Sequence, residues 1–216
     1  MPTLAYWKIR GLAQPIRLLL NYVGEDFEDL YYEQGDAPGY SREAWYKVKY
    51  TLGFPFPNLP YYIDGDTKIT QSNAILRYIA GKHNLLGQTE EEKLNVDILL
   101  EYAMDYRNII VRLAYNPEYE KLLPEFITKS KIEVLPTCEK WLSDKKWFCG
   151  DSVTVADFPI YEQFDQARIM VPGILDEFPK ITAFMKAFEE LPGIKKYMSS
   201  PKFMVRPINN KSATFK

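Results

Sequence analysis

The stretch FPFPNLPYYIDGDTKITQSN, residues 54–73, decides the fold of the first third of this chain. Its three prolines exclude a helix, and the last of them, Pro60, leads directly into the apolar run Tyr61–Ile63, which is typical of a strand. A proline at that point favours a cis peptide bond, which turns the chain sharply. The DGD triplet at 64–66 then predicts a hairpin turn into a second short strand, Thr67–Thr70.

The end of the same stretch predicts an anion site. Gln71 and Ser72 precede an apolar run of helical period, so we place Ser72 at the start of a helix. The first turn of a helix presents free backbone N–H groups and a partial positive charge, and both attract carboxylates. The stretch therefore combines an exposed backbone edge with an anion site, which suits a small peptide that carries a free carboxylate.

The N-terminus supplies the preceding elements. Thr3–Ile9 is expected to be a strand, Gly11 breaks it, and a helix begins at Gln14 with Pro15 well placed in its first turn. Glu28–Tyr32 is expected to be the next strand. Alternating strands and helices, followed by two adjacent strands and a helix, are typical of a thioredoxin-like α/β domain.

Composition narrows the class of protein. The 216 residues suffice for one large or two small domains, the hydrophobic share of 46% is ample for a core, and the net charge is −2. We see no basic stripe for nucleic acid and no apolar run long enough to span a membrane. Cys138 and Cys149 have no metal-ligand spacing, and with His83 as the single histidine we expect neither a histidine triad nor a metal site. No signal peptide is evident, so a reduced, cytoplasmic location is expected.

The second half of the chain is predicted to be helical. Thr89 and the acids after it start a helix that runs to Tyr115, and another is expected over Pro124–Leu142. Thr154 as the N-cap and Asp157 as the third helical residue resemble a capping box, so a helix is expected to begin directly after Thr154, and we interpret this box as a structural signal. We expect a thioredoxin-like domain over residues 1–82, a linker over 83–89 and an all-α domain over 90–216.

Several motifs together carry a resemblance to a known family. They are Tyr6-Trp7 with Arg10-Gly11-Leu12, Gly35–Pro38, Trp45 with Lys49, Phe56–Pro60, Ile63–Gly65 and Thr70–Ile75. On these residues the chain resembles the cytosolic glutathione transferases, and within them the mu class, over nearly its whole length. The resemblance implies a transferase that joins the glutathione thiolate to apolar electrophiles, with glutathione as co-substrate and no metal.

Tyr6 is the expected catalytic residue. A thiol with a pKa of about 8.5 is mostly protonated near neutral pH, although the thiolate is the nucleophile. A phenol stays protonated, so it can donate a hydrogen bond to the thiolate and lower the thiol pKa. In the family, the tyrosine at this place does this work. Periodicity alone would make Tyr6 one more buried strand aromatic, and the flanking motif favours catalysis.

The resemblance also implies the glutathione contacts. Gln71 and Ser72 would bind the γ-glutamyl carboxylate, and Leu59 would pair its backbone with the cysteinyl part of the peptide. Trp45 and Lys49 would hold the glycyl carboxylate. The remaining residues implied at this site are Trp7, Leu12, Arg42, Asn58 and, contributed from a neighbouring subunit, Asp105. Arg42 and Lys49 could alternatively lie on a solvated charged surface.

The electrophile site and the dimer contacts follow in the same way. Tyr115 would hydrogen-bond the substrate, although packing at the end of its helix is an alternative. Other residues implied at the electrophile site are Met104, Ile208, Asn209 and Leu12. A homodimer is implied, with Phe56 entering the partner subunit and Arg77 and Asp97 near the two-fold axis.

Some alternatives stay open, and some positions differ from the family. A non-catalytic glutathione binder and a glutathione-dependent isomerase or peroxidase are possible, whereas a disulfide oxidoreductase is excluded because the expected site holds no cysteine. Phe54 and Pro55 differ from the commoner residues of their loop, and Gln34 stands at a pocket position that is often apolar. The tail 206–216, which would help to cap the electrophile site, differs most from the family. Substrate preference is therefore the property that the resemblance implies least.

Overall fold

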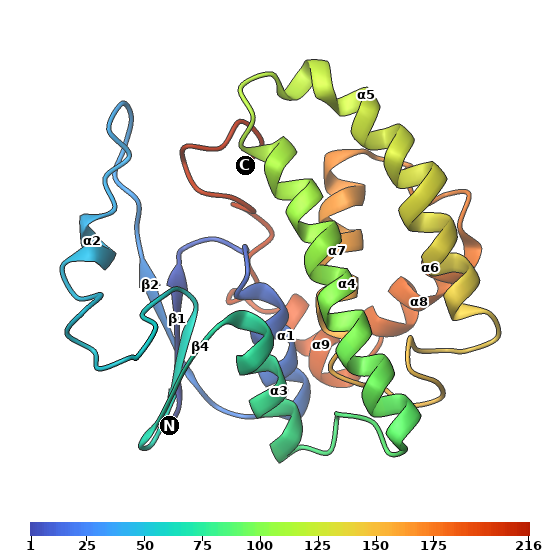
Figure 1. The fold of residues 1–216 in the computed structure, drawn as a ribbon, viewed down its shortest axis with the longest axis horizontal. Helices are drawn as coiled ribbons and strands as arrows, with labels where there is room; N and C mark the ends of the chain where they lie inside the picture. Colours follow the sequence, from blue (N-terminus) through green and yellow to red (C-terminus); the bar gives the residue numbers. More distant parts are fainter.

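The structure is a computed structural model that describes residues 1–216, and its N-terminal part contains a four-stranded sheet (Figure 1). The strands are β1 Thr3–Trp7, β2 Glu28–Tyr32, β3 Tyr61–Asp64 and β4 Thr67–Thr70. Their order is β2-β1-β3-β4, with β1 parallel to β2 and β3 antiparallel to both β1 and β4. The central strand β1 is shorter than expected, because the regular pairing with β2 ends at Trp7.

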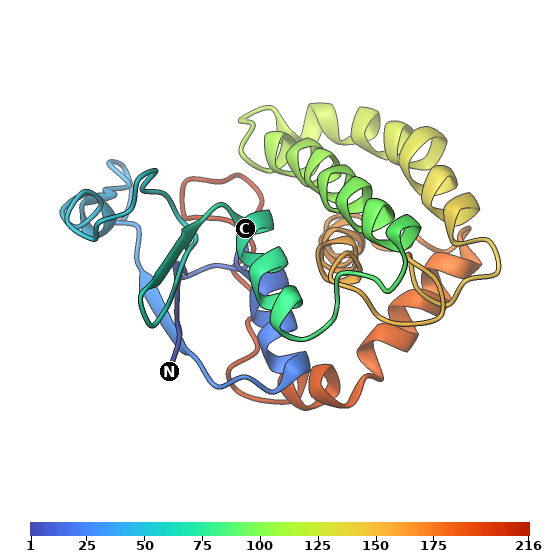
Figure 2. The same ribbon diagram turned by 60° about the horizontal axis from the view of Figure 1, so that its bottom comes forward.

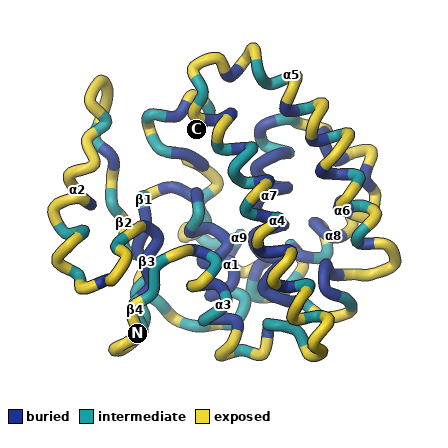
Figure 3. Tube along the Cα trace, viewed as in Figure 1, coloured by how far each residue is buried: buried dark blue, intermediate teal, exposed yellow.

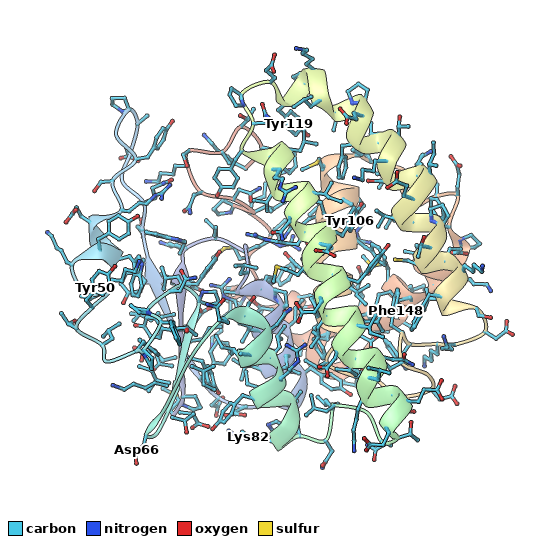
Figure 4. All side chains as sticks on the ribbon, in the orientation of Figure 1. Tyr50, Asp66, Lys82, Tyr106, Tyr119 and Phe148 are labelled. Carbon is cyan, nitrogen blue, oxygen red and sulfur yellow. The ribbon has the colours of Figure 1, made fainter.

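The predicted hairpin joins β3 to β4. Asp64 pairs with Thr67, and Gly65 between them has φ 58°, a left-handed conformation that costs glycine little. Asp66 lies at the tip of this hairpin (Figure 4). The turn sequence therefore fixes the register of the two strands.

Two helices cover one face of the sheet. They are α1 Gln14–Val23, with Pro15 in its first turn, and α3 Ser72–Lys82. The short helix α2, Glu43–Tyr46, lies on the other side of the strands (Figure 1). The expected helix starts at Gln14 and Ser72 are confirmed.

The rest of the chain is helical. The helices are α4 Glu90–Ala114, α5 Tyr119–Lys129, α6 Leu135–Leu142, α7 Asp157–Met170, α8 Pro179–Glu189 and α9 Pro192–Met198, with a π-helical segment η1 over Ser130–Val134. Thr89 begins α4 with a capping box, in which its hydroxyl accepts the Glu92 N–H at 3.1 Å and the Glu92 carboxylate accepts the Thr89 N–H at 3.1 Å. None of these helices is both long enough and apolar enough to pass through a bilayer.

Two expected helix starts are wrong. α5 begins at Tyr119 rather than Pro124, because Asn116 Oδ1 accepts the Glu118 N–H at 2.9 Å and starts the helical path earlier. α7 begins at Asp157 with Ala156 as its cap. Only half of the expected box forms there: the Asp157 carboxylate accepts the Thr154 N–H at 2.8 Å, while the Thr154 hydroxyl donates to that carboxylate at 3.3 Å.

One hydrophobic core runs through both parts of the molecule. Helices α1 and α3 lie between the sheet and the C-terminal helices (Figure 2), and α1 packs against α7 and α9. Most of α7 is buried, whereas the loop around α2 and much of α5 are exposed (Figure 3). The buried Arg10 donates to Glu162 on α7 at 2.6 and 3.0 Å and pairs with Asp165, so an ion cluster joins the loop after β1 to the helical part.

The tail 206–216 crosses from the sheet to the end of α4 (Figure 1). Its start is held by the loop after β1, where the Gly11 N–H donates to the Ile208 carbonyl at 3.1 Å. Its end is held by α4, where the Phe215 N–H donates to the Ala114 carbonyl at 3.0 Å. The tail thereby forms one wall between the N-terminal sheet and α4.

Candidate active site

The loop before β3 carries the cis peptide bond expected at Leu59-Pro60. Leu59 is buried, and its backbone N–H donates to Asn58 Oδ1 at 2.9 Å. A peptide that pairs with the backbone of Leu59 must therefore displace this side chain or use the Leu59 carbonyl. The Asn58 side chain thus occupies the one N–H that Leu59 offers at this backbone edge.

Tyr6 lies on the central strand β1 and is 5% exposed. Burial raises the pKa of its hydroxyl, and the positive charge of Arg107 and a hydrogen bond from the Leu12 backbone act in the opposite direction. Gly11, at φ 43°, allows the ring to sit there, since a Cβ at this position would lie 2.5 Å from Tyr6 Cε1. The phenol is therefore protonated at neutral pH and able to donate a hydrogen bond.

A cavity of about 420 Å³ opens in front of Tyr6. It lies between the loop that carries α2, the loop before β3, α4 and the tail. Nine of the expected site residues line it: Tyr6, Trp7, Arg42, Trp45, Lys49, Asn58, Leu59, Tyr115 and Asn209. The fold therefore gathers residues from the first strand to the C-terminal tail, from Tyr6 to Ser212, around one cavity.

A second, much narrower hollow adjoins this cavity. Expected residues from three different elements line it, namely Leu12, Ser72 and Met104. Gly11 and Arg107 line both spaces, so the two lie next to one another. Ser72 is the first residue of α3, which places its backbone N–H at the positive end of that helix.

Three expected site residues line neither space. Gln71 is exposed beside the helix start with φ 74°, and Asp105 is exposed on α4. Ile208 is 1% exposed, and its carbonyl accepts the Gly11 N–H, so its observed contact is structural.

The expected dimer residues lie on the surface. Phe56 is 77% exposed between its prolines. Arg77 pairs within the chain with Asp97 at 2.8 Å and with Glu101 at 2.9 Å. Phe56 is therefore free to contact another molecule, and the Arg77 cluster exists without one.

Positive charge dominates the lining of the main cavity. Its charged residues are Arg42, Lys49 and Arg107, and no Asp or Glu lines it. Burial lowers the pKa of the Arg107 guanidinium, an effect that Tyr6 and Tyr115 oppose. The cavity is therefore suited to a ligand that carries negative charge.

Sequence reasoning missed four polar lining residues, which are Arg107, Tyr46, Asn210 and Ser212. Arg107 could have been found, because Met104, Arg107 and Tyr115 are spaced three and eight residues apart and share one face of a helix. Asn210 and Ser212 belong to an irregular segment, whose position no periodic pattern predicts. Tyr115 holds that segment, since its hydroxyl accepts the Asn210 N–H at 2.9 Å.

Comparison with known proteins identifies the family. The model of the glutathione S-transferase N-terminal domain matches residues 2–81, and that of the C-terminal domain matches residues 104–201. Glutathione S-transferase Mu 1 of Oryctolagus cuniculus is 50% identical over 99% of this chain and 97% of its own length. Human glutathione S-transferase Mu 4 is 49% identical over the same shares. A solved structure, that of the glutathione S-transferase Blo t 8, superposes with a TM-score of 0.89 at 32% identity and covers 98% of both chains.

The chain therefore belongs to the glutathione S-transferase family, with a thioredoxin-like N-terminal domain and a helical C-terminal domain. Within that family it is a mu-class enzyme, which uses glutathione as its co-substrate.

Proposed function

We propose that this enzyme conjugates glutathione to apolar electrophiles, and that the Tyr6 hydroxyl stabilises the attacking thiolate. The observation that carries the proposal is the buried phenol of Tyr6 at the wall of a cavity free of carboxylates. Such a phenol donates to a thiolate without accepting its proton. Each unit by which the thiol pKa falls corresponds to about 1.4 kcal/mol.

The chemical step is a displacement or an addition by sulfur. The glutathione thiol releases its proton to solvent, and the thiolate remains hydrogen-bonded to Tyr6. The sulfur lone pair then forms a bond to the electrophilic carbon, and a leaving group such as chloride departs with its bonding electrons. Holding sulfur and carbon together lowers the barrier further by removing the entropy cost of their encounter.

Glutathione is proposed to lie along the main cavity. Arg42, Trp45 and Lys49 hold its glycyl carboxylate at the α2 end. Leu59 and Asn58 contact the cysteinyl part, and Trp7 and Leu12 enclose it. The γ-glutamyl carboxylate reaches Gln71 and Ser72 at the start of α3, where the helix N-terminus stabilises an anion.

The electrophile is proposed to bind beside Tyr115. Met104, Ile208 and Asn209 are proposed to complete this part of the site. Ile208 is buried, so its proposed role is to position the adjacent Asn209. Both Tyr115 and Asn209 line the main cavity, which supports this placement. The tail and α4 then decide which electrophiles enter.

A homodimer is proposed as the working form. The exposed Phe56 enters the partner, and Arg77 and Asp97 lie near the two-fold axis. Asp105, which is exposed and lines neither cavity of its own chain, then reaches the γ-glutamyl amine bound to the partner. A symmetric pair buries both Phe56 side chains at once.

The organisation and location of the enzyme are also proposals. We propose domains over 1–82 and 90–216 with a linker over 83–89, which agrees with the interval between α3 and α4. A cytoplasmic location is supported by the free, buried thiols of Cys138 and Cys149. No nucleic-acid or membrane partner is proposed, and no metal is required for the chemistry.

Conjugation of glutathione to 1-chloro-2,4-dinitrobenzene by the wild type and by Tyr6→Phe tests the function. Loss of one hydrogen bond to a charged sulfur should lower kcat/KM by about 10- to 100-fold, since such bonds contribute about 1.5–3 kcal/mol. Retention of both proteins on immobilised glutathione shows that binding survives. Equal turnover by the two proteins would refute the role of Tyr6, and an inactive wild type that still binds glutathione would favour a binding protein.

A further inference from the structure

Arg107 is the charged residue that α4 contributes to the main cavity. Its guanidinium is partly buried and near enough to Tyr6 and Tyr115 to influence both hydroxyls electrostatically. Its side-chain hydrogen bond is to Asn108 Oδ1, at 3.2 Å, which is a neutral acceptor. The positive charge of Arg107 therefore faces the cavity without a carboxylate.

Two fully buried arginines and one half-exposed arginine of this chain are paired with acids. Arg10 contacts Glu162 at 2.6 Å, Arg17 contacts Asp29 at 2.7 Å, and Arg168 contacts Asp165 at 2.7 Å. Arg107 forms no ion pair, and burial lowers the pKa of its guanidinium. Withdrawing a cation from water without a partner costs free energy, and an anionic ligand recovers that cost.

The position of Arg107 separates it from the other two cations of the cavity. Arg42 directly precedes α2 and Lys49 follows it, whereas Arg107 lies on α4, on the other side of the N-terminal strands (Figure 1). In the proposed function the first two hold the glycyl carboxylate of glutathione. The γ-glutamyl carboxylate is assigned there to Gln71 and Ser72, so the proposed function gives Arg107 no glutathione carboxylate, although Arg107 also lines the hollow beside Ser72.

The surroundings of Arg107 combine apolar and polar walls. Val111 follows it by one helical turn and also lines the cavity, as does Ile9. Asn210 and Ser212 bring neutral hydrogen-bonding groups from the tail. A ligand with an apolar body and one acidic group would match both kinds of wall.

We propose that Arg107 selects electrophiles that carry a carboxylate, by pairing with that group while the apolar body packs on Val111 and Ile9. The inference rests on the proposed function and specifies the substrate class of the same site. The planar guanidinium can bind both oxygens of a carboxylate, which fixes the orientation of the substrate. The class is that of apolar α,β-unsaturated ketones or activated aryl halides that bear a remote acid.

The carboxylate takes no part in bond making. With an unsaturated ketone, the thiolate sulfur bonds to the β-carbon, the π pair of the C=C bond forms a new double bond between the α-carbon and the carbonyl carbon, and the π pair of the C=O bond moves onto oxygen, which gives an enolate. The enolate then takes a proton from water at the α-carbon. Arg107 is therefore a specificity residue, and its effect is expected in KM more than in kcat.

The test compares ethacrynic acid, an unsaturated ketone with a remote carboxylate, with its primary amide, which reacts at the same carbon. We expect the wild type to favour the acid in kcat/KM by about tenfold, which corresponds to about 1.4 kcal/mol. Arg107→Gln should remove this preference through a higher KM for the acid, and Arg107→Lys should keep part of it. Arg112→Gln removes the same charge from an exposed site on the same helix and should keep the full preference.

Two results would overturn the proposal. One is an acid-to-amide ratio that Arg107→Gln leaves unchanged, including the case in which both substrates lose activity equally because the guanidinium acts on the thiolate. The other is a ratio that falls as far in Arg112→Gln as in Arg107→Gln. Turnover of the amide by the wild type is a separate readout, so failure of this proposal is distinguishable from failure of the proposed transferase function.

Discussion

Asp157 shows how a single buried side chain supports the helical domain. Its carboxylate accepts the Phe148 N–H at 2.9 Å and the Thr154 N–H at 2.8 Å, and it is fully buried. Burial raises its pKa from 3.8 to about 6, and these hydrogen bonds limit the rise. The side chain thus ties the loop before α7 to the first turn of that helix.

Asp157→Ala should lower the free energy of unfolding by about 2–5 kcal/mol, because it leaves two buried N–H groups without an acceptor. The pKa is higher in the folded state, so the contribution of the carboxyl is complete below its unfolded pKa and declines as the pH rises through about 6. The difference between wild type and variant should therefore be larger at pH 4 than at pH 7. Denaturant unfolding at both values measures it.

The exposed Asp151 offers a matched control, six residues earlier in the same loop. Asp151→Ala should change the free energy of unfolding by no more than about 0.5 kcal/mol. An Asp157→Ala protein as stable as Asp151→Ala would contradict the capping role.

At this scale the sequence indicates some site residues and hides others. Tyr6 and Trp45 stand in recognisable motifs, and the fold brings both to the cavity. Arg107 has no motif, and a single arginine on a helix usually lies on a solvated face. Whether Arg107 faces solvent or the cavity depends on which elements pack around α4, and the tertiary structure decides this.

Among the elements, the tail 206–216 is the one that closes the cavity. Gln34, which is 4% exposed, donates to Ser212 Oγ at 3.4 Å and accepts the Ser212 N–H at 3.2 Å. Lys211 also pairs with Asp36 at 2.6 Å, but both side chains are largely exposed. The buried amide, rather than the ion pair, should fix this part of the tail.

Gln34→Ala should therefore loosen the tail. Loss of two hydrogen bonds of about 1 kcal/mol each should speed amide exchange at Ser212 by about tenfold or more, as local opening becomes less costly. Hydrogen exchange of the C-terminal peptide measures the change. Lys211→Ala is the control, since an exposed ion pair contributes about 0–1 kcal/mol, and equal exchange in the two variants would contradict the assignment.

Element boundaries were predictable where turn chemistry marks them. β2, β4 and the starts of α1, α3 and α4 lie where the sequence placed them. The helix boundaries between Tyr119 and Leu142 are harder to predict, because a proline such as Pro124 is typical of a helix start but lies inside α5. Pro136 follows the π-helical segment η1, and proline lacks the N–H that would continue regular pairing. The chain is nevertheless helical on both sides of each proline.

For the whole molecule, the buried ion cluster of Arg10 joins the two domains. Arg10 lies directly after β1, and both of its acidic partners lie on α7. The fold class was predictable from the element pattern, but this pairing joins residues 152 positions apart and leaves no local signal. The cluster fixes the loop that also holds Gly11 against Tyr6.

Phe56→Ala should weaken the proposed dimer. Two Phe56 side chains would leave the interface per dimer, and loss of such anchors should raise the dimer Kd by at least about a hundredfold. Sedimentation velocity over a range of concentrations measures this. Tyr50 is a matched control, because it is 79% exposed at the edge of the molecule in the same segment (Figure 4). A dimer equally stable in Phe56→Ala and Tyr50→Ala would contradict the assignment.

The central claim is that the Tyr6 hydroxyl stabilises the glutathione thiolate. The most direct measurement is the pH titration of the ultraviolet thiolate absorbance of glutathione bound to the wild type and to Tyr6→Phe. We predict a bound-thiol pKa at least one unit below the free value of about 8.5 in the wild type, and a value close to the free one in the variant. The same low pKa in both complexes would contradict the account.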